Sequence, residues 1–540
     1  MCYSEGMNKS ETFLWYDLET FGLDARSDRI AQFAAVRTNS ELKVMGDPIV
    51  LYCRLSDDYL PDPLAVLVTG ITPQYVNEHG VSEREFITRI HKLMSQANTC
   101  SVGYNTIAFD DEFIRHALFR NFFDPYKREY ENGNSRWDIL DLVRATHDFR
   151  PEGIHWPRKE NGNPSFKLTD LTEANNIEHE GAHDALSDVY ATLNLARLIK
   201  EKQPRLFDYY LTLRNKHAVK ELLRVPMGEP VVLTGGRFTS PSGCSTVVMP
   251  LSSVTSNPNT VIVFDLLQDP SNLLDSSRTF KELEDVSQKE DNFKKVAQQA
   301  RKALKDGASL EPVLEKAQQL LEEAATMVAT LPRLVGGKSQ LLREQGVHKI
   351  QINKVPFISP LSIITEALAT KLDIDLEMVK KHRQMLYEDD LLAVNIRKAA
   401  DSEQYPLVSD VDFSLYSAFF SDKDHQLFNI IRETSPTELW DRHFDFKDSR
   451  AHEMLWRYLC RSFPEEIIPE QQPRWRSFCT ERIISPPGKS INTLQFFARK
   501  IEEKVSSKET SPQDKELLVT LEAYGKELCS RLGIQYPSHL

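Results

Sequence analysis

The sequence contains no long apolar segment. No run of hydrophobic residues approaches the roughly 20 that a membrane-spanning helix needs. Residues 1–10 are polar and lack the basic and then apolar pattern of a secretory signal. We therefore expect a cytoplasmic protein with no membrane segment.

Paired cysteines and an excess of positive charge are also missing. The seven cysteines are odd in number, scattered and free of Cys-x-x-Cys pairs. This argues against a disulfide framework or a zinc site and fits a reducing compartment. The formal net charge of −13 gives no overall sign of a nucleic-acid-binding protein. A basic channel can be hidden by acidic surface elsewhere, so the charge does not exclude that class.

The composition that remains is that of a globular protein. Its 540 residues are too many for one core, and 41% of them are hydrophobic and 27% charged. This length predicts roughly two to four domains.

The most informative stretch is residues 13–22, where an apolar run ends in Asp-x-Glu and then Thr-Phe-Gly. The run has strand length and is apolar up to Tyr16, which predicts a strand buried in a sheet. Side chains two apart in a strand point to the same face, so Asp17 and Glu19 converge. Two carboxylates with no adjacent cation repel each other, which favours a hard divalent metal between them. The alternative is an ordinary strand end with two solvated acids.

The segments that follow predict a sheet with flanking helices. Residues 29–55 have the pattern of a β-meander that pairs antiparallel with the first strand. Residues 67–73 contain a Gly and a Pro that mark a turn, and residues 82–97 have the apolar stripe of a helix.

Two later segments supply further candidate ligands. Residues 101–115 predict a short strand, a polar turn and a helix that starts near Asp110, where the helix dipole stabilises a carboxylate. Residues 181–200 predict another helix, with His183 and Asp188 on adjacent flanks. Asp188 can then reach a metal while His183 reaches a water beside it. Alone, Asp110 is also explained as a simple helix-terminal acid, and His183 as a surface or capping residue.

Together these motifs form a pattern that is hard to obtain by accident. Asp-x-Glu, Phe-Asp at a helix start and His-x4-Asp on a later helix resemble the DEDDh 3′→5′ exonucleases, which share an RNase H-like α/β fold. Further segments resemble the bacterial exonuclease I family, which degrades single-stranded DNA processively from the 3′ end. These segments are residues 104–105, 120–126, 134–138, 150–153 and 203–209. The resemblance is close through about Lys216 and looser afterwards.

The resemblance implies the chemistry of the site. Four carboxylates would hold two Mg²⁺ ions around the scissile phosphate, with Mn²⁺ as a possible substitute. These carboxylates are Asp17, Glu19, Asp110 and Asp188. His183 would take the proton from the attacking water, since its unperturbed pKa is near neutrality. The motif does not require the adjacent acids Asp111 and Asp184, which we expect to be solvated or capping groups.

The resemblance also implies contacts to single-stranded DNA. The residues expected to meet the strand are Glu19, Arg115, Tyr126, Tyr130, Arg144 and Lys167. Tyr126 and Tyr130, with Lys127 and Arg128 between them, form an aromatic and basic cluster of the kind that stacks bases and binds phosphates. Tyr130 stands where the family has Trp and Lys167 where it has Arg, and both keep the chemistry. The alternative is ordinary surface charge with tyrosines half in the core.

A protein partner is implied as well. Members of the family bind the acidic tail of single-stranded-DNA-binding protein. Arg150 and Tyr209 would contribute to a basic and aromatic pocket for that tail.

The rest of the chain predicts two further domains. Strand-like segments separated by Gly, Ser and Pro turns resemble the SH3-like barrel of the family; they are residues 229–233, 245–251, 260–266 and 347–354. A charged, strongly helical segment at residues 278–329 predicts a helical hairpin inserted into the barrel, with a solvated spacer as the alternative. From residue 358 the pattern is helical and resembles the domain that closes over the nuclease cleft.

We therefore expect domains at residues 1–203, 204–357 and 358–540. They are an α/β RNase H-like exonuclease domain with a mixed sheet flanked by helices, an SH3-like β-barrel domain and an all-α C-terminal domain. The expected function is processive 3′→5′ degradation of single-stranded DNA to 5′-mononucleotides, by a monomer acting in DNA repair and recombination.

Two alternatives stay open. The first is an RNA 3′ exonuclease, since the DEDDh core serves both nucleic acids, although the long barrel and helical extension favour DNA. The second is a catalytically dead binding module on the same fold. A complete set of four acids with His183 speaks against it.

Overall fold

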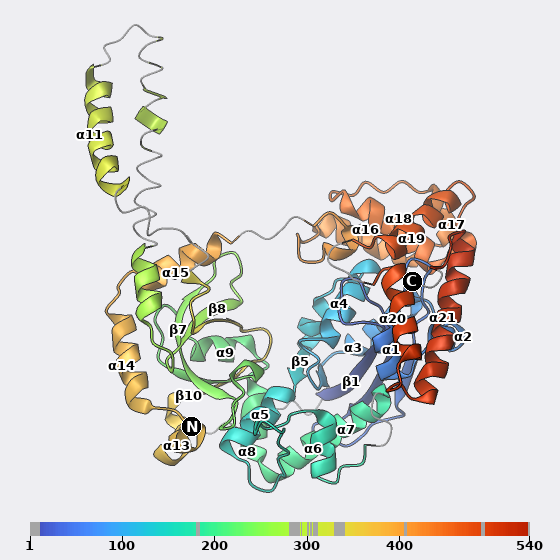
Figure 1. The fold of residues 1–540 in the computed structure, drawn as a ribbon, viewed down its shortest axis with the longest axis horizontal. Helices are drawn as coiled ribbons and strands as arrows, with labels where there is room; N and C mark the ends of the chain where they lie inside the picture. Colours follow the sequence, from blue (N-terminus) through green and yellow to red (C-terminus); the bar gives the residue numbers. More distant parts are fainter. Residues whose placement is uncertain are drawn as a thin grey trace.

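The computed structural model describes residues 11–179, 184–279, 311–328, 341–403, 408–487 and 492–537, with scattered residues between 292 and 305. An α/β domain, a β-barrel domain and a helical domain follow one another along the chain (Figure 1). The expected fold class is confirmed.

A mixed five-stranded sheet forms the centre of the first domain. Its order is β3-β2-β1-β4-β5. β1 pairs antiparallel with β2, as does β2 with β3, whereas β4 runs parallel to both β1 and β5. The strands are β1 (Thr12–Thr20), β2 (Ile30–Thr38), β3 (Ile49–Tyr52), β4 (Thr99–Gly103) and β5 (Ser135–Asp138). The predicted meander and buried strand are thus confirmed.

The apolar run of β1 is explained by burial on both faces of the sheet. Phe13 and Trp15 join a core with residues of α5, α7 and α8, whereas Leu14 and Tyr16 join a second core with residues of α3 and α4. Asp17 and Glu19 continue the face of Phe13 and Trp15, the face against which α7 packs.

Helices cover both faces of this sheet. They are α1 (Pro63–Thr69), α2 (Pro73–His79), α3 (Glu83–Met94), α4 (Asp110–Arg120), α5 (Leu140–Phe149), α6 (Leu168–Ala174) and α7 (Ala185–Lys202), with the short 3₁₀ helices η1 (Lys127–Glu129) and η2 (Glu131–Gly133). The predicted turn is confirmed at Gly70, which ends α1 with a φ of 69°. The helices α1 and α2 were not expected from the sequence; each begins with Pro behind an N-cap residue, Asp62 and Thr72.

The second domain is an antiparallel five-stranded barrel sheet in the order β10-β6-β7-β8-β9. Its strands are β6 (Val231–Thr234), β7 (Ser245–Ser253), β8 (Thr260–Asp265), β9 (Val347–Gln351) and β10 (Phe357–Pro360). The helical elements before, within and after it are α8 (Pro204–Thr212), α9 (Lys216–Leu222), η3 (Gly236–Phe238), α11 (Glu311–Val328), η5 (Leu361–Ile363), α13 (Glu366–Leu372), α14 (Leu376–Tyr387) and α15 (Leu392–Asp401). The predicted helical insertion at residues 278–329 contains the helix α11. Most of its other residues lie outside the described part of the chain.

The third domain is helical and packs on the nuclease domain. Its elements are η6 (Val411–Phe413), α16 (Asp422–Glu433), α17 (Pro436–Asp441), α18 (Arg450–Ser462), η7 (Pro464–Glu466), α19 (Gln472–Ile484), α20 (Leu494–Ser506) and α21 (Pro512–Leu532). α21 packs against α1 and α18 against α3, and Figure 1 shows the helical domain over the end of the nuclease domain that carries α4. Two shared apolar cores join the domains: Phe122 packs with Phe428 and Tyr458, and Val66 lies in one core with Leu521. Within the described part of the chain, no helix is long and apolar enough to cross a membrane.

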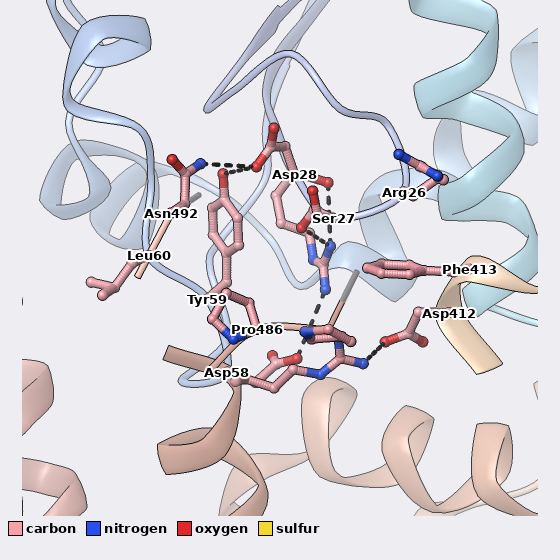
Figure 2. A pocket seen from close by; sticks show the side chains of 13 residues that line it. Arg26, Ser27, Asp28, Asp58, Tyr59, Leu60, Asp412, Phe413, Pro486 and Asn492 are labelled. Atoms are coloured by element: carbon pink, nitrogen blue, oxygen red, sulfur yellow. Dashed lines mark hydrogen bonds and ion pairs between the residues drawn. The ribbon is translucent and has the colours of Figure 1, made fainter. Parts of the chain in front are cut away.

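Buried charges add a second link between these two domains. Arg461 of α18 pairs at 2.7 Å with both Asp58 of the nuclease domain and Asp412 of η6. Arg482 of α19 also pairs with Asp412 at 2.7 Å. Figure 2 shows the small pocket that lies at this seam, where the side chain of Asp28 faces Tyr59 and Asn492.

Candidate active site

Asp17 and Glu19 form the base of an acidic cluster at the end of β1. Because alternate residues of a strand share a face, both carboxylates point towards the first turn of α7. There Asp188 joins them: one carboxylate oxygen from each of Asp17, Glu19 and Asp188 lies within 4.8 Å of the other two. The cluster shares no residue with the pocket of Figure 2.

Asp110 approaches the same strand end from α4. It is the first residue of that helix and is 4% exposed. Its Oδ1 accepts a 2.9 Å hydrogen bond from the backbone N–H of Leu18, which lies between Asp17 and Glu19. After burial, repulsion from Asp110 contributes to the raised pKa of Asp17.

Asp188 is positioned by contacts at the start of α7. Asp184 caps this helix by accepting a hydrogen bond from the backbone N–H of Ser187. Gln32 of β2, the neighbour of Glu19 across the sheet, donates to Asp184 at 2.9 Å and accepts from the backbone N–H of Ala185. The side chain of one residue on the sheet thus fixes the register of α7 against β1. The expectation that Asp184 is a capping group is confirmed.

His179 holds the Asp188 carboxylate from the other side. Its Nε2 lies 2.5 Å from Oδ1 of Asp188, and its Nδ1 lies 3.1 Å from Oγ1 of Thr172 on α6. The His179 side chain is only 5% exposed. The imidazole therefore links α6 to the acidic cluster.

The electrostatics of the cluster are those of a cation site. Burial, and then repulsion from Asp17, Asp188 and Asp184, raises the pKa of Glu19 to about 9. Burial, and then repulsion from Asp110, Asp188 and Asp184, raises the pKa of Asp17 well above its usual value. Burial likewise raises the pKa of Asp110, although the hydrogen bond from Leu18 opposes the effect.

These residues fit a hard divalent metal. Among the described residues, no lysine or arginine pairs with Asp17, Glu19, Asp110 or Asp188, and the basic side chain that contacts the cluster is His179, beside Asp188. Three clustered carboxylates with a fourth beside them cost free energy without a cation, whereas their oxygens are the ligands that a divalent cation prefers. A cation at this point would offset both the burial and the mutual repulsion that raise the pKa values of these carboxyl groups.

His183, the predicted proton acceptor, lies outside the described residues. Asp111, by contrast, does not behave as predicted. It is 1% exposed and accepts hydrogen bonds from Tyr16, Arg128 and Arg136 at 2.8, 2.6 and 2.7 Å. Burial alone would raise the pKa of Asp111, but the two guanidinium groups outweigh it and hold the pKa below its usual value. The expectation of a solvated or capping group is wrong because Asp111 is the anion of a buried ionic core.

The expectation for Arg128 is also wrong, because this residue is buried as well. It was expected to belong to a surface cluster with Tyr126, Lys127 and Tyr130, but it is 2% exposed and points into the protein towards Asp111. Lys127 and Tyr130 are exposed, and Tyr126 is half-buried. The basic residues of this segment therefore face in opposite directions.

The other residues predicted to contact DNA differ in how deeply they are buried. Arg115 is 4% exposed and forms ion pairs with Glu129 and Glu112, while its guanidinium carbon lies 5.3 Å from the Tyr126 ring centroid. Arg144 is partly buried and pairs with Asp141, and Lys167 is exposed at the start of α6.

The two residues predicted to bind a partner tail lie near the junction with the barrel. Arg150 is exposed and ends α5. The preceding residue, Phe149, and Tyr209 both pack against Phe357 of β10, with ring centroids 5.9 and 6.0 Å away. Tyr209 and the neighbour of Arg150 thus share a contact at the nuclease–barrel junction.

Sequence reasoning missed Gln32 and His179. Gln32 lies in a strand that was predicted correctly, but its role depends on pairing across the sheet with Glu19. His179 comes shortly before the His-x4-Asp motif. Its position nine residues before Asp188 gives no helical register, because α7 begins only at Ala185.

The fold and the acidic cluster define an exonuclease domain, and the exonuclease family model matches residues 14–196. The models of the exonuclease I SH3-like domain and of the exonuclease I C-terminal domain match residues 214–330 with 332–400, and residues 409–528. Exodeoxyribonuclease I of Escherichia coli (strain K12) is 36% identical over 97% of this chain and 99% of its own length. The chain belongs to the exodeoxyribonuclease I family.

Solved structures of that family match the whole arrangement. The zinc-bound complex of E. coli exonuclease I with single-stranded DNA has a TM-score of 0.79 and 36% identity, covering 96% of this chain and 99% of the other. A structure of SSB and exonuclease I with the inhibitor CFAM has a TM-score of 0.79 and 35% identity, with the same coverage.

Proposed function

We propose that this exonuclease degrades single-stranded DNA processively from the 3′ end and releases 5′-mononucleotides. The observation that carries the proposal is the cluster of Asp17, Glu19 and Asp188 with Asp110 beside it, with which no described lysine or arginine pairs. The family relationship supports the substrate, since a relative of the same architecture forms a complex with single-stranded DNA.

In this proposal the four carboxylates hold two Mg²⁺ ions, with Mn²⁺ as a substitute. When bound, the ions neutralise the scissile phosphate and lower the pKa of the attacking water. Asp17 and Glu19 are fixed by β1, and Asp188 is oriented by the contact with His179. His183 takes the proton from the attacking water.

The strand is held by groups around the cluster. Tyr126 and Tyr130 stack on bases, Arg144 and Lys167 contact phosphates, and Glu19 contacts the terminal nucleotide. Arg115 acts through its place under the Tyr126 ring, because its own charges are already paired with Glu112 and Glu129.

The cellular role extends this proposal. We expect the protein to act as a cytoplasmic monomer in DNA repair and recombination. Arg150 and Tyr209 bind the acidic tail of single-stranded-DNA-binding protein, a partner seen with exonuclease I in a solved relative. The domain boundaries at residues 203 and 357 belong to the same proposal.

The proposal is tested by comparing matched 5′-labelled single-stranded DNA, duplex DNA and RNA oligomers, each with Mg²⁺ or EDTA. We expect metal-dependent shortening of the single-stranded DNA from its 3′ end, with mononucleotides as product. Faster loss of the RNA would overturn the choice of substrate and leave the metal site. No hydrolysis of any oligomer would overturn the enzyme and leave a binding protein.

A further inference from the structure

Asp138, the last residue of β5, is a partly buried acid outside the metal cluster. Within the described residues, no lysine or arginine pairs with it. The nearest arginines along the chain, Arg136 and Arg144, pair with Asp111 and Asp141 instead. Burial raises the pKa of the Asp138 carboxyl to about 6. The fold thus keeps an acid at a cost beside a catalytic strand, which marks Asp138 as a candidate functional residue.

The Asp138 carboxylate is held by backbone N–H groups in place of a cation. Its Oδ1 accepts hydrogen bonds from the N–H groups of Asn105 at 2.9 Å and Leu140 at 3.0 Å. Its Oδ2 accepts from the N–H of Ile107 at 3.1 Å. The bond from Leu140 is local and would by itself make Asp138 a cap for α5. The other two cross to the turn after β4, 33 and 31 residues earlier in the chain.

This turn leads directly into α4, whose first residue is Asp110. Asn105 has a φ of 65°, a left-handed conformation that non-glycine residues rarely adopt and that persists where neighbouring groups hold it. The N–H of Phe109 donates to the backbone oxygen of Asn105 at 3.2 Å, and the N–H of Asp111 donates to that of Thr106 at 2.9 Å. The position that Asp138 gives to the turn is therefore passed to the first residues of α4.

The turn also lies against the strand that carries Asp17. β1 and β4 run parallel, so their carboxyl ends share one edge of the sheet. A Cβ atom on Gly103, the last residue of β4, would lie 2.8 Å from the backbone oxygen of Tyr16. Only glycine lets the two strands approach this closely. A displacement of the turn would therefore move Asp110 relative to the acidic end of β1.

We propose that Asp138 is a positioning residue of the nuclease site: its carboxylate holds the turn before α4 and thereby sets Asp110 against the end of β1. This inference rests on the proposed function, in which Asp110 is one of the metal ligands. Groups that are hydrogen-bonded behind a metal ligand commonly set its orientation and the affinity for the metal. After burial and repulsion from Asp111, repulsion from Asp138 also contributes to the raised pKa of Asp110. Charge and position therefore have to be separated by experiment.

The test measures two properties of the full chain without DNA. They are Mn²⁺ affinity, by isothermal titration calorimetry, and hydrogen–deuterium exchange of residues 104–112 in EDTA. Asp138→Asn leaves one acceptor oxygen, so at least one of the three N–H groups faces an amide donor. We expect this variant to bind Mn²⁺ about 10-fold more weakly than wild type, and Asp138→Ala, which removes all three bonds, about 100-fold. Exchange of residues 104–112 should become faster in the same order.

Asp375→Asn is the matched control. Asp375 also accepts two backbone hydrogen bonds, from the N–H groups of Glu377 and Met378 at the start of α14. This variant should match wild type in Mn²⁺ affinity and in the exchange of residues 104–112. If Asp138→Asn binds Mn²⁺ as tightly as wild type, the positioning role is disproved. Weaker binding with unchanged exchange would also disprove it, since the loss would then come from the missing charge alone.

Urea unfolding and hydrolysis separate this role from stability and from the proposed function. Asp138→Asn is isosteric and is expected to fold; it carries the test alone if Asp138→Ala does not. A loss of stability with unchanged Mn²⁺ affinity would show that Asp138 only caps α5, and would overturn the proposal. If the wild-type protein binds Mn²⁺ but does not hydrolyse a single-stranded 20-mer in Mg²⁺, the proposed function falls. The Mn²⁺ affinities and exchange rates still decide the role of Asp138 in that case.

Discussion

Individual carboxylates of the acidic cluster destabilise the metal-free fold, although the proposed activity needs them. Burial and mutual repulsion raise the pKa of Glu19 from 4.5 to about 9. A carboxyl group with a raised pKa in the folded state stabilises the fold below its unfolded pKa and loses that contribution as pH rises. The metal-free protein should therefore lose stability from this group between about pH 4.5 and pH 9.

Glu19→Gln replaces this carboxyl group with a neutral amide. In EDTA at pH 8 we expect its melting temperature to rise by about 2–5 °C above wild type, because the amide removes the cost of keeping a buried carboxyl group protonated or charged beside Asp17 and Asp188. Added Mn²⁺ should raise the melting temperature of wild type but not of the variant. Thermal melts with and without metal measure both effects. A variant less stable than wild type in EDTA would show that the cluster is not under repulsion.

His179 is predicted to set the position of Asp188. His179→Ala should weaken Mn²⁺ binding about 10- to 100-fold, as for loss of a group that orients a metal ligand. Isothermal titration calorimetry of the protein with Mn²⁺, in the absence of DNA so that no hydrolysis occurs, measures the affinity directly. His217→Ala, an exposed histidine on α9, is the control and should bind Mn²⁺ as wild type does. Unchanged affinity in His179→Ala would mean that the Asp188 contact has no such role.

Among the elements, α4 depends on a buried ionic core that its sequence does not reveal. Asp111 pairs with Arg128 and Arg136, both nearly inaccessible. Asp111→Asn leaves two guanidinium groups short of an anion, and we expect a loss of about 3–5 kcal/mol of unfolding free energy. Urea unfolding at pH 7 measures it. Glu85→Gln, which breaks an exposed pair with Arg89, should cost no more than about 1 kcal/mol. A similar small loss for both variants would contradict this account.

Whether a feature could be predicted from the sequence depends on how far apart along the chain its interacting residues lie. The carboxylates of β1 follow from alternation within one strand, and Asp110 and Asp188 from helix starts combined with the family resemblance. The environment of Asp111 was not predictable because its partners lie 17 and 25 residues later, on η1 and β5. Gln32 and His179 depend in the same way on contacts across the sheet and between helices. The short helices α1 and α2 were missed because their apolar stripes are too short to give a period.

At the scale of the whole molecule, processive degradation requires the C-terminal domain to stay on the nuclease domain while the strand passes. Arg461 joins Asp58 to Asp412 across that seam. Arg461→Ala should loosen the contact, so that α18 and α19 become sensitive to limited proteolysis and fewer nucleotides are released per binding event. A heparin trap added after binding measures the second effect. Arg442→Ala removes an exposed pair with Glu438 and serves as the control. Equal processivity of Arg461→Ala and wild type would contradict a role for this seam.

The central claim is that the acidic cluster cuts single-stranded DNA from the 3′ end with bound divalent metal. Its most direct test compares wild type with Asp188→Asn on one oligonucleotide labelled in turn at each end, in Mg²⁺ and in EDTA. We predict that wild type with Mg²⁺ releases the 3′ label at once as a mononucleotide and the 5′ label last. Asp188→Asn and the EDTA reactions should leave the strand intact. Full activity of Asp188→Asn, or release of the 5′ label first, would contradict the account.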